Sequence, residues 1–293
     1  MRIGSYDLLP VETGRFALDG GAMFGVVPRA LWERTNPPDE RNRVPLALRA
    51  LLARELAPSG RPTGRNLLVD TGIGAKWNDK GADIYGVDHR DFSIERGLAA
   101  HGLGVEDIDE VLLTHLHFDH AGGATRRTGD GSLVPTFPKA RYYVQARNLA
   151  WARDPTEKDR ASYLPENFEP LLEAGVLETL DGPGPFREGL EILITDGHTE
   201  AMQLPLFRGP EGALLYCADL VPTASHIPVP WVMAYDNRPL VTIEEKKLLL
   251  ARAVEEGWWL FFEHDLFGPA AKVIEGPKGY LAGERGFPDD RPS

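Results

Sequence analysis

Residues 114–123 read Thr-His-Leu-His-Phe-Asp-His-Ala-Gly-Gly, directly after a stretch, residues 107–113, that ends in the apolar run Val-Leu-Leu. This pattern predicts a short buried strand that ends where the motif begins. Three histidines and one aspartate within six residues are costly to bury without partners, because imidazole and carboxylate groups lose their hydration. Zinc, or a similar divalent ion, accepts this mixture of nitrogen and oxygen ligands. The motif therefore predicts a metal centre at the end of a strand.

The motif has the form His-x-His-x-Asp-His, with His115 and His117 followed by Asp119 and His120. It resembles the signature of the metallo-β-lactamase superfamily, and the resemblance covers residues 67–267. This resemblance implies an α/β fold built as a four-layer αββα sandwich, in which two mixed β-sheets are flanked by helices. We expect a single domain over residues 1–293, with a loosely held C-terminal tail from about residue 276, where glycine, proline and charged residues are frequent.

The remaining candidate ligands also follow predicted strands, since His198 comes after residues 190–195, Asp219 after 213–216 and His264 after 258–262. Loops at strand ends can present polar side chains in one cleft. Asp70 follows the predicted strand 66–69 and either supports the metal loop or caps its own turn. By the resemblance, the first metal is held by His115, His117 and His198, the second by Asp119, His120 and His264, and Asp219 bridges both.

Comparison with branches of the superfamily narrows the interpretation. Asp219 stands where the common β-lactamases of this fold use cysteine, and we expect Cys217, two residues earlier, to be a buried strand residue. Residues 219–226 and the loop 20–25 resemble the branch of acyl-homoserine lactonases and methyl-parathion-type hydrolases. Those lactonases carry a tyrosine three residues after the bridging aspartate, where this chain has Pro222. Without that tyrosine, the metal, Tyr235 or His226 would polarise a substrate carbonyl. The alternative for His226 is a loop histidine whose hydrogen bonds are satisfied within the protein.

The amino-acid composition limits the kinds of partner that the protein can bind. The chain has 293 residues, a formal net charge of −12 and a single cysteine, which excludes an internal disulfide and a multi-thiolate zinc site. The acidic balance, without a basic cluster, argues against nucleic acid, and no apolar stretch is long enough to cross a bilayer. We therefore expect a cytoplasmic protein with a small-molecule substrate and neither nucleic-acid nor membrane partners, and a homodimer is one oligomeric state left open.

The rest of the chain predicts alternating strands and helices. Residues 3–27 suit strands joined by turns, and residues 44–56 fit either element, with the resemblance favouring a strand. The clearest helix is expected at 242–256, opened by a capping box formed by Thr242 and Glu245. Further helices are expected at 93–101, 146–153 and within 162–175, and further strands at 141–144, 176–180, 190–195, 204–207, 213–216 and 258–262.

These observations predict a binuclear metal-dependent hydrolase that attacks a small ester, lactone or thioester with a metal-bridging hydroxide. Asp119 would orient the hydroxide and pass a proton to the leaving group. Two divalent ions are expected as cofactors, with zinc favoured and manganese or iron as alternatives. The competing hypotheses are a phosphotriester or phosphodiester hydrolase of the same fold and a mononuclear iron dioxygenase acting on persulfides.

Overall fold

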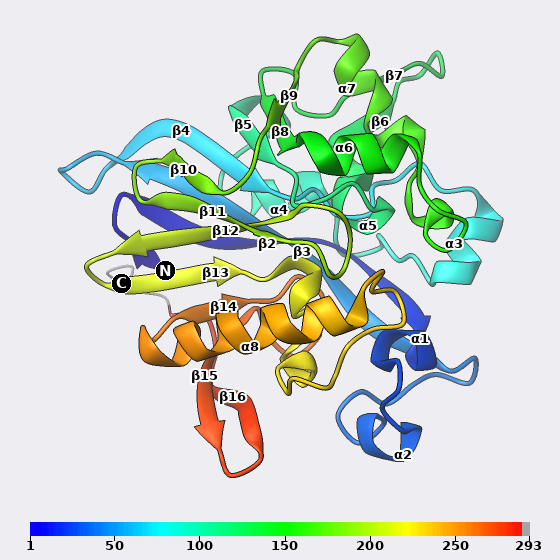
Figure 1. Cartoon of the computed structure of the whole chain (residues 1–293). Helices are drawn as coiled ribbons and strands as arrows, with labels where there is room; N and C mark the ends of the chain where they lie inside the picture. Colours follow the sequence, from blue (N-terminus) through cyan, green and yellow to red (C-terminus); the bar gives the residue numbers. More distant parts are fainter. Residues whose placement is uncertain (289–293) are drawn as a thin grey trace.

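Two seven-stranded β-sheets pack face to face in this computed structural model, which describes residues 1–288, and helices cover their outer faces (Figure 1). The first sheet has the order β1-β2-β3-β4-β5-β8-β9 and the second the order β10-β11-β12-β13-β14-β15-β16. Both sheets combine parallel and antiparallel neighbours. The predicted αββα sandwich with two mixed sheets is therefore confirmed.

The strands β1 to β4 of the first sheet pair antiparallel, and β4, β5, β8 and β9 continue the sheet as parallel neighbours. Residues 44–56, which fitted either element, form a strand because their apolar side chains meet buried surfaces on both faces of the sheet. The strands are β1 (Arg2–Ile3), β2 (Tyr6–Asp19), β3 (Arg43–Leu56), β4 (Pro62–Val69), β5 (Glu110–Leu112), β8 (Arg141–Gln145) and β9 (Leu177–Leu180).

The second sheet is antiparallel except where β13 and β14 run parallel. Its strands are β10 (Gly184–Arg187), β11 (Leu190–Thr195), β12 (Met202–Gly209), β13 (Gly212–Tyr216), β14 (Trp259–Phe261), β15 (Ala270–Gly276) and β16 (Gly279–Arg285). A separate two-stranded ribbon pairs β6 (Thr125–Arg127) with β7 (Leu133–Pro135). The α-helices are α1 (Gly20–Phe24), α2 (Arg29–Trp32), α3 (Asp79–Tyr85), α4 (Ile94–Ala99), α5 (Phe118–Ala121), α6 (Ala146–Arg153), α7 (Glu169–Glu173) and α8 (Pro239–Glu255).

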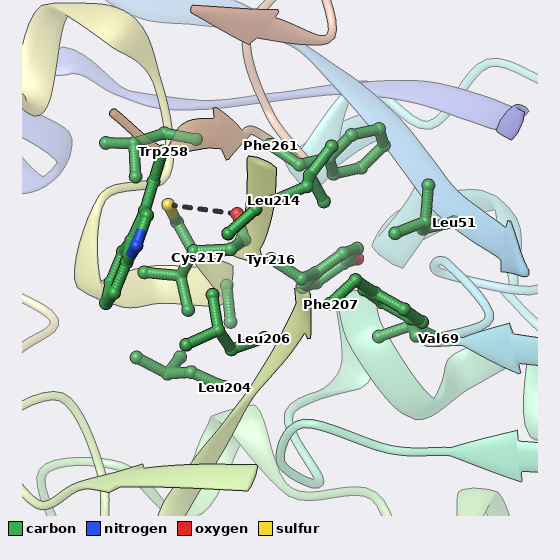
Figure 2. Packing of buried hydrophobic residues seen from close by; sticks show 14 of the residues in the cluster. Leu51, Val69, Leu204, Leu206, Phe207, Leu214, Tyr216, Cys217, Trp258 and Phe261 are labelled. Carbon is green, nitrogen blue, oxygen red and sulfur yellow. Dashed lines mark hydrogen bonds between the residues drawn. The ribbon is translucent and has the colours of Figure 1, made fainter. Parts of the chain in front are cut away.

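Strand alternation builds the core on both faces of the first sheet. In β4, Leu67 and Val69 join the core between the sheets, whereas Leu68 points to the core beneath the helices on the outer face. Figure 2 shows part of the core between the sheets, where Val69 lies near Phe207 of the second sheet. Strands buried on both faces read as continuous apolar runs, and such a run precedes each metal-binding loop.

The structure differs from the sequence-based expectations in three places. Residues 3–27 begin with the expected strands, β1 and β2, joined by a turn, but they then form the short helix α1, which was not expected. Helix α8 starts at Pro239, so Thr242 lies inside it and the predicted capping box is wrong. Instead, the Glu245 carboxylate accepts hydrogen bonds from the backbone N–H groups of Asp196 and Gly197, because it can satisfy two donors of the loop that carries His198.

The expected loosely held tail is the third difference. Residues 279–285 form β16, which pairs with β15 at the edge of the second sheet. Residues 289–293 of that tail lie outside the described part of the chain. None of the helices within residues 1–288 combines the length and the apolarity needed to span a bilayer.

Candidate metal centre

The seven predicted ligands come from four segments that the fold brings together. His115 and His117 lie in the turn after β5, while Asp119 and His120 lie in α5. The other three follow strands of the second sheet: His198 comes after β11, Asp219 after β13 and His264 after β14. Because β4 and β5 run parallel, as do β13 and β14, the loops at their carboxyl ends meet at a common edge.

The first group consists of His115, His117, His198 and Asp219, all of them buried. The His117 Nδ1 atom lies 3.0 Å from His115 Nε2 and 3.1 Å from His198 Nε2. The Asp219 Oδ2 atom lies 3.0 Å from His198 Nε2 and 4.0 Å from His115 Nε2. Four donor atoms therefore surround one point, as a tetrahedral divalent ion requires.

The second group consists of Asp119, His120 and His264, and Asp219 connects it to the first. The His264 Nε2 atom lies 3.4 Å from His120 Nε2 and 3.6 Å from Asp119 Oδ2. Asp219 faces this group with both oxygens, since Oδ1 lies 3.3 Å from His264 Nε2 and Oδ2 lies 3.5 Å from His120 Nε2. The Oδ1 atom faces no ligand of the first group. That oxygen is buried and has no hydrogen-bond partner within residues 1–288, so a second cation between the groups would satisfy it.

Hydrogen bonds on the far side of the rings determine which nitrogen faces the site. The Nδ1 atom of His198 lies 2.9 Å from the Asp236 carboxylate, and that of His264 lies 3.0 Å from the Ala47 carbonyl oxygen. The Nδ1 atom of His120 lies 2.8 Å from Glu263 Oε2 and 3.0 Å from Asp70 Oδ2. Since these partners accept hydrogen bonds, each Nδ1 carries a proton, and each Nε2 would present its lone pair to a bound metal ion. Lone pairs that converge in this way fit a cation.

The pKa values of the candidate ligands in the absence of metal also indicate a site for a cation. Burial lowers the pKa of His198, but Asp219 and Asp236 outweigh burial and raise it to about 9. Burial likewise raises the pKa of Asp219, but the imidazoles of His120 and His198 hold it well below its ordinary value. The carboxylates thus keep positive charge at this site. A bound dication would provide that charge and displace the protons.

Asp70 supports the metal loop. This residue is fully buried and follows β4 with a φ of 58°. Its Oδ1 accepts the Thr114 N–H at 2.7 Å, and its Oδ2 accepts the Thr114 hydroxyl at 2.8 Å in addition to His120 Nδ1. Of the two sequence-based alternatives, the contacts favour support of the loop.

Two glycines allow the loop to pack this closely. A Cβ atom on Gly123 would lie 2.2 Å from the Thr71 carbonyl oxygen, and one on Gly122 would lie 2.1 Å from that of Ile73. Either contact is far shorter than van der Waals distance. The Gly-Gly exit seen in the sequence is therefore required for the loop to lie against the turn after β4.

A cavity of about 150 Å³ opens over the two groups. Its walls are mainly apolar, and its polar atoms outside the candidate ligands include the side chains of Tyr85, Tyr235 and Lys158. The Lys158 ammonium donates to the Tyr235 carbonyl oxygen at 2.9 Å. The apolar walls are formed by Leu18, Met23, Phe118, Ala161 and Met233. The arrangement suits a small molecule that reaches the candidate ligands.

Comparisons with known proteins agree with this geometry. The sequence profile of the metallo-beta-lactamase superfamily matches residues 61–264. The chain belongs to the metallo-β-lactamase superfamily. Family membership and the buried His/Asp groups confirm the predicted class, a metal-dependent hydrolase of this fold. No curated protein matched the chain in sequence.

Several solved structures resemble the whole chain. A probable metal-dependent hydrolase from Staphylococcus aureus is 28% identical, with a TM-score of 0.84 over 97% of this chain and 99% of its own. The hydrolase AbOPH is 19% identical, with a TM-score of 0.78 over 99% and 97%. The dizinc quorum-quenching lactonase AidC is 16% identical, with a TM-score of 0.77 over 99% and 97%. The last two likenesses show the shared fold.

Within this superfamily fold, two candidate residues from the sequence take different places. Tyr235 lines the cavity. His226 does not: it is buried, its Nε2 donates to the Met23 carbonyl oxygen at 2.8 Å, and its Nδ1 accepts from the Thr223 hydroxyl at 2.8 Å. Burial lowers the pKa of His226 to about 3, so it is the satisfied loop histidine of the two alternatives. Cys217 is buried as expected, but it lies directly after β13 and not in the strand.

The sequence-based interpretation missed residues that hold the ligands of this superfamily centre. Asp236 and Glu263 bind the far sides of His198 and His120. Glu263 directly precedes a candidate ligand, which is a usable signal, because residues adjacent to ligands often support them. Asp236 lies in the loop before α8, and nothing in its local sequence relates it to His198. Tyr85 and Lys158 were missed for the same reason.

Proposed function

We propose that the chain binds two divalent metal ions and hydrolyses a small ester, lactone or thioester. The observation that carries this proposal is the position of Asp219 between the two groups of ligands. Its Oδ2 lies 3.0 Å from His198 Nε2 of the first group and 3.5 Å from His120 Nε2 of the second, and its Oδ1 lies 3.3 Å from His264 Nε2. A carboxylate so placed can bridge two ions. Zinc is the favoured metal, with manganese and iron as alternatives.

Bound dications would bring the pKa of a coordinated water near neutrality and polarise a substrate carbonyl. Asp119 is the residue of the chain that would hold the proton. It lines the cavity, and its Oδ2 also faces His120 and His264. Burial, opposed by those two imidazoles, raises the pKa of Asp119. A carboxylate with a raised pKa accepts a proton more readily, and Asp119 would then donate it to the leaving group.

Tyr235 supplies a donor that Pro222 cannot. Its hydroxyl makes no hydrogen bond to any residue within 1–288, although its ring lines the cavity. Burial raises the pKa of Tyr235 above its ordinary value, so the hydroxyl keeps its proton at neutral pH. We infer that it donates a hydrogen bond to the substrate carbonyl as negative charge develops on the oxygen.

The cavity supports the substrate class. Its volume of about 150 Å³ lies below the roughly 300–1,000 Å³ of sites for drug-sized ligands. The apolar walls favour a short hydrocarbon group next to the reacting bond, and Lys158 is the cationic side chain among the lining residues.

The test joins elemental analysis of the chain, purified without added metal, to a hydrolysis screen of lactone, aryl ester, thioester and phosphotriester substrates. We expect about two zinc or manganese ions per chain and turnover that chelation abolishes. Asp219→Ala should lose metal and activity together, whereas Asp119→Asn should retain metal and lose turnover. Asp181→Asn, an exposed carboxylate, is the matched control.

Other outcomes would contradict parts of the proposal. About one iron per chain with oxygen consumption and no hydrolysis would favour the dioxygenase, and turnover restricted to the phosphotriester would change the substrate class. Tyr235→Phe should lower kcat by about a hundredfold with the metal content unchanged. The control is Tyr280→Phe, since Tyr280 lies on β16. Equal kcat values for the wild type and Tyr235→Phe would remove Tyr235 from the reaction.

A further inference from the structure

The loop that carries His264 is held from the first sheet, and we call residues 262–265 the His264 loop. Ala47 of β3 contacts His264 in two ways. The Ala47 N–H donates to the His264 carbonyl oxygen at 3.2 Å, and the Ala47 carbonyl oxygen lies 3.0 Å from His264 Nδ1. The backbone and the imidazole of this candidate ligand are therefore both fixed by one residue of β3.

Arg49, two residues further along β3, holds both ends of the His264 loop. Its side chain is buried, and its Nη1 donates to the carbonyl oxygens of Phe262 and Asp265, each at 3.0 Å. These two residues lie on either side of Glu263 and His264 in the sequence. A single guanidinium group thus closes the loop around the candidate ligand.

The charge of Arg49 is balanced by Glu12. Glu12 lies directly opposite Arg49 in the pairing of β2 with β3, and its Oε1 lies 2.5 Å from Arg49 Nε. A buried cation is costly unless it is paired and hydrogen-bonded. The planar guanidinium presents its donors in a fixed fork, whereas a lysine ammonium is a single point of charge. Arginine can therefore pair with Glu12 and bind two carbonyl oxygens at once.

Tyr216, at the end of β13, extends these contacts to the other histidine of the second group. Its hydroxyl lies 3.2 Å from the Arg49 carbonyl oxygen and 2.7 Å from Glu263 Oε2. The same Glu263 oxygen lies 2.8 Å from His120 Nδ1. Arg49, Tyr216 and Glu263 therefore form one buried network that bears on both His120 and His264.

The first group is held by a different arginine. Arg238, directly before α8, donates to the Asp196 carbonyl oxygen at 2.8 Å and pairs with Glu200 at 2.7 Å, so it binds both sides of the turn that carries His198. Within residues 1–288, neither arginine makes a hydrogen bond or ion pair to the loop that the other one holds. Each group of candidate ligands thus has its own cationic clamp.

We propose that Arg49 is a positioning residue for the second metal ion, the one assigned to Asp119, His120 and His264. This role rests on the two-ion function proposed above. Without the guanidinium, the carbonyl oxygens of Phe262 and Asp265 lose their shared donor, and the His264 loop is held less firmly. The second ion then binds more weakly, while the first group keeps its own contacts and its affinity.

Zinc titration into chelator-treated protein, in competition with a chromophoric chelator, measures the two stepwise affinities. His264→Ala removes a ligand of the second group and so identifies the affinity that belongs to the first. Arg49→Gln should weaken the second affinity about 10–100-fold and leave the first unchanged. Arg49→Lys keeps a charge opposite Glu12 and should recover part of the loss. The matched control, Arg238→Gln, should weaken the first affinity instead.

Tyr216→Phe removes a single oxygen atom and should weaken the second affinity about tenfold, so it tests the network even if Arg49→Gln fails to fold. Equal loss of both affinities in Arg49→Gln would mean that Arg49 supports only the fold and would overturn the proposal. Two ions in the wild type with an unchanged second affinity in Arg49→Gln would refute the role of Arg49 alone. A single ion, bound equally well by the wild type and by His264→Ala, would refute the two-ion function and this role with it.

Discussion

Replacing Asp70 by asparagine tests how the metal loop is held. The Asp70 Oδ2 accepts hydrogen bonds from the Thr114 hydroxyl at 2.8 Å and from His120 Nδ1 at 3.0 Å, and its Oδ1 accepts the Thr114 N–H at 2.7 Å. Asp70 has a φ of 58°, a conformation that asparagine adopts as readily as aspartate. The substitution therefore changes the side-chain atoms and leaves the backbone as it is.

The magnitude follows from the contacts. Asparagine keeps one oxygen, which can still accept the Thr114 N–H, and places an NH₂ group where Oδ2 faced two donors. The Thr114 hydroxyl loses its hydrogen bond to a charged group, whereas His120 Nδ1 keeps the Glu263 carboxylate at 2.8 Å. The free energy of unfolding should therefore fall by about 1.5–3 kcal/mol. Loss of one of the two carboxylates at His120 Nδ1 should also weaken metal binding, by about tenfold.

Two assays separate these effects. Urea unfolding of chelator-treated protein measures the stability change, and titration against a chromophoric chelator measures metal affinity. Asp181→Asn, at an exposed position, controls for the loss of a carboxylate. If Asp70→Asn unfolded at the wild-type urea concentration with an unchanged m-value, the contacts assigned to Asp70 would not stabilise the fold. A loss of stability with wild-type metal affinity would instead mean that Asp70 only caps its own turn.

Three further predictions concern other parts of the fold. Because carboxylates raise the pKa of His198 to about 9, this ring carries a proton in the metal-free protein at neutral pH. Zinc binding should release that proton, and the affinity for zinc should fall as the pH falls below about 9. Calorimetry in two buffers of different ionisation enthalpy measures the release, and zinc binding without proton release would contradict this protonation state of His198. Gly123→Ala places a Cβ 2.2 Å from a carbonyl oxygen and should lower metal content and thermal stability, whereas Gly129→Ala, with open space around it, should not. Lys246→Met removes the donor to three carbonyl oxygens of the loop before α8 and should lower the free energy of unfolding by about 1–3 kcal/mol. Urea unfolding measures this change, with Lys247→Met as the control, and equal unfolding midpoints for the two variants would show that the loop does not depend on Lys246.

The architecture and the candidate ligands were accessible from local sequence. Strands buried on both faces appear as apolar runs, and each ligand follows such a run; Leu112 and Leu113 precede the motif in this way. The signature in the loop is dense enough to relate the chain to a superfamily, and the superfamily relates the distant residues His198 and His264 to it. This information is carried by spacing along the chain.

The edges of the fold were harder to predict. The sequences of strands β15 and β16 do not show strong apolar alternation. These strands form because each pairs with a neighbour in the second sheet. Glu245 has the spacing of a capping box, but its carboxylate binds the loop before His198 instead. In both cases a partner distant in sequence decides the outcome, and local propensity does not contain that partner.

The sequence by itself determined the ligand types, their positions at strand ends and the glycines that let the loop pack closely. Only the tertiary structure decided that Asp236 and Glu263 orient His198 and His120, that Tyr235 and not His226 faces the cavity, and that a second cavity lies behind the metal loop. The physical reason is that periodicity and turn chemistry act between neighbours in the chain, whereas hydrogen-bond partners and cavities arise where segments far apart in sequence meet.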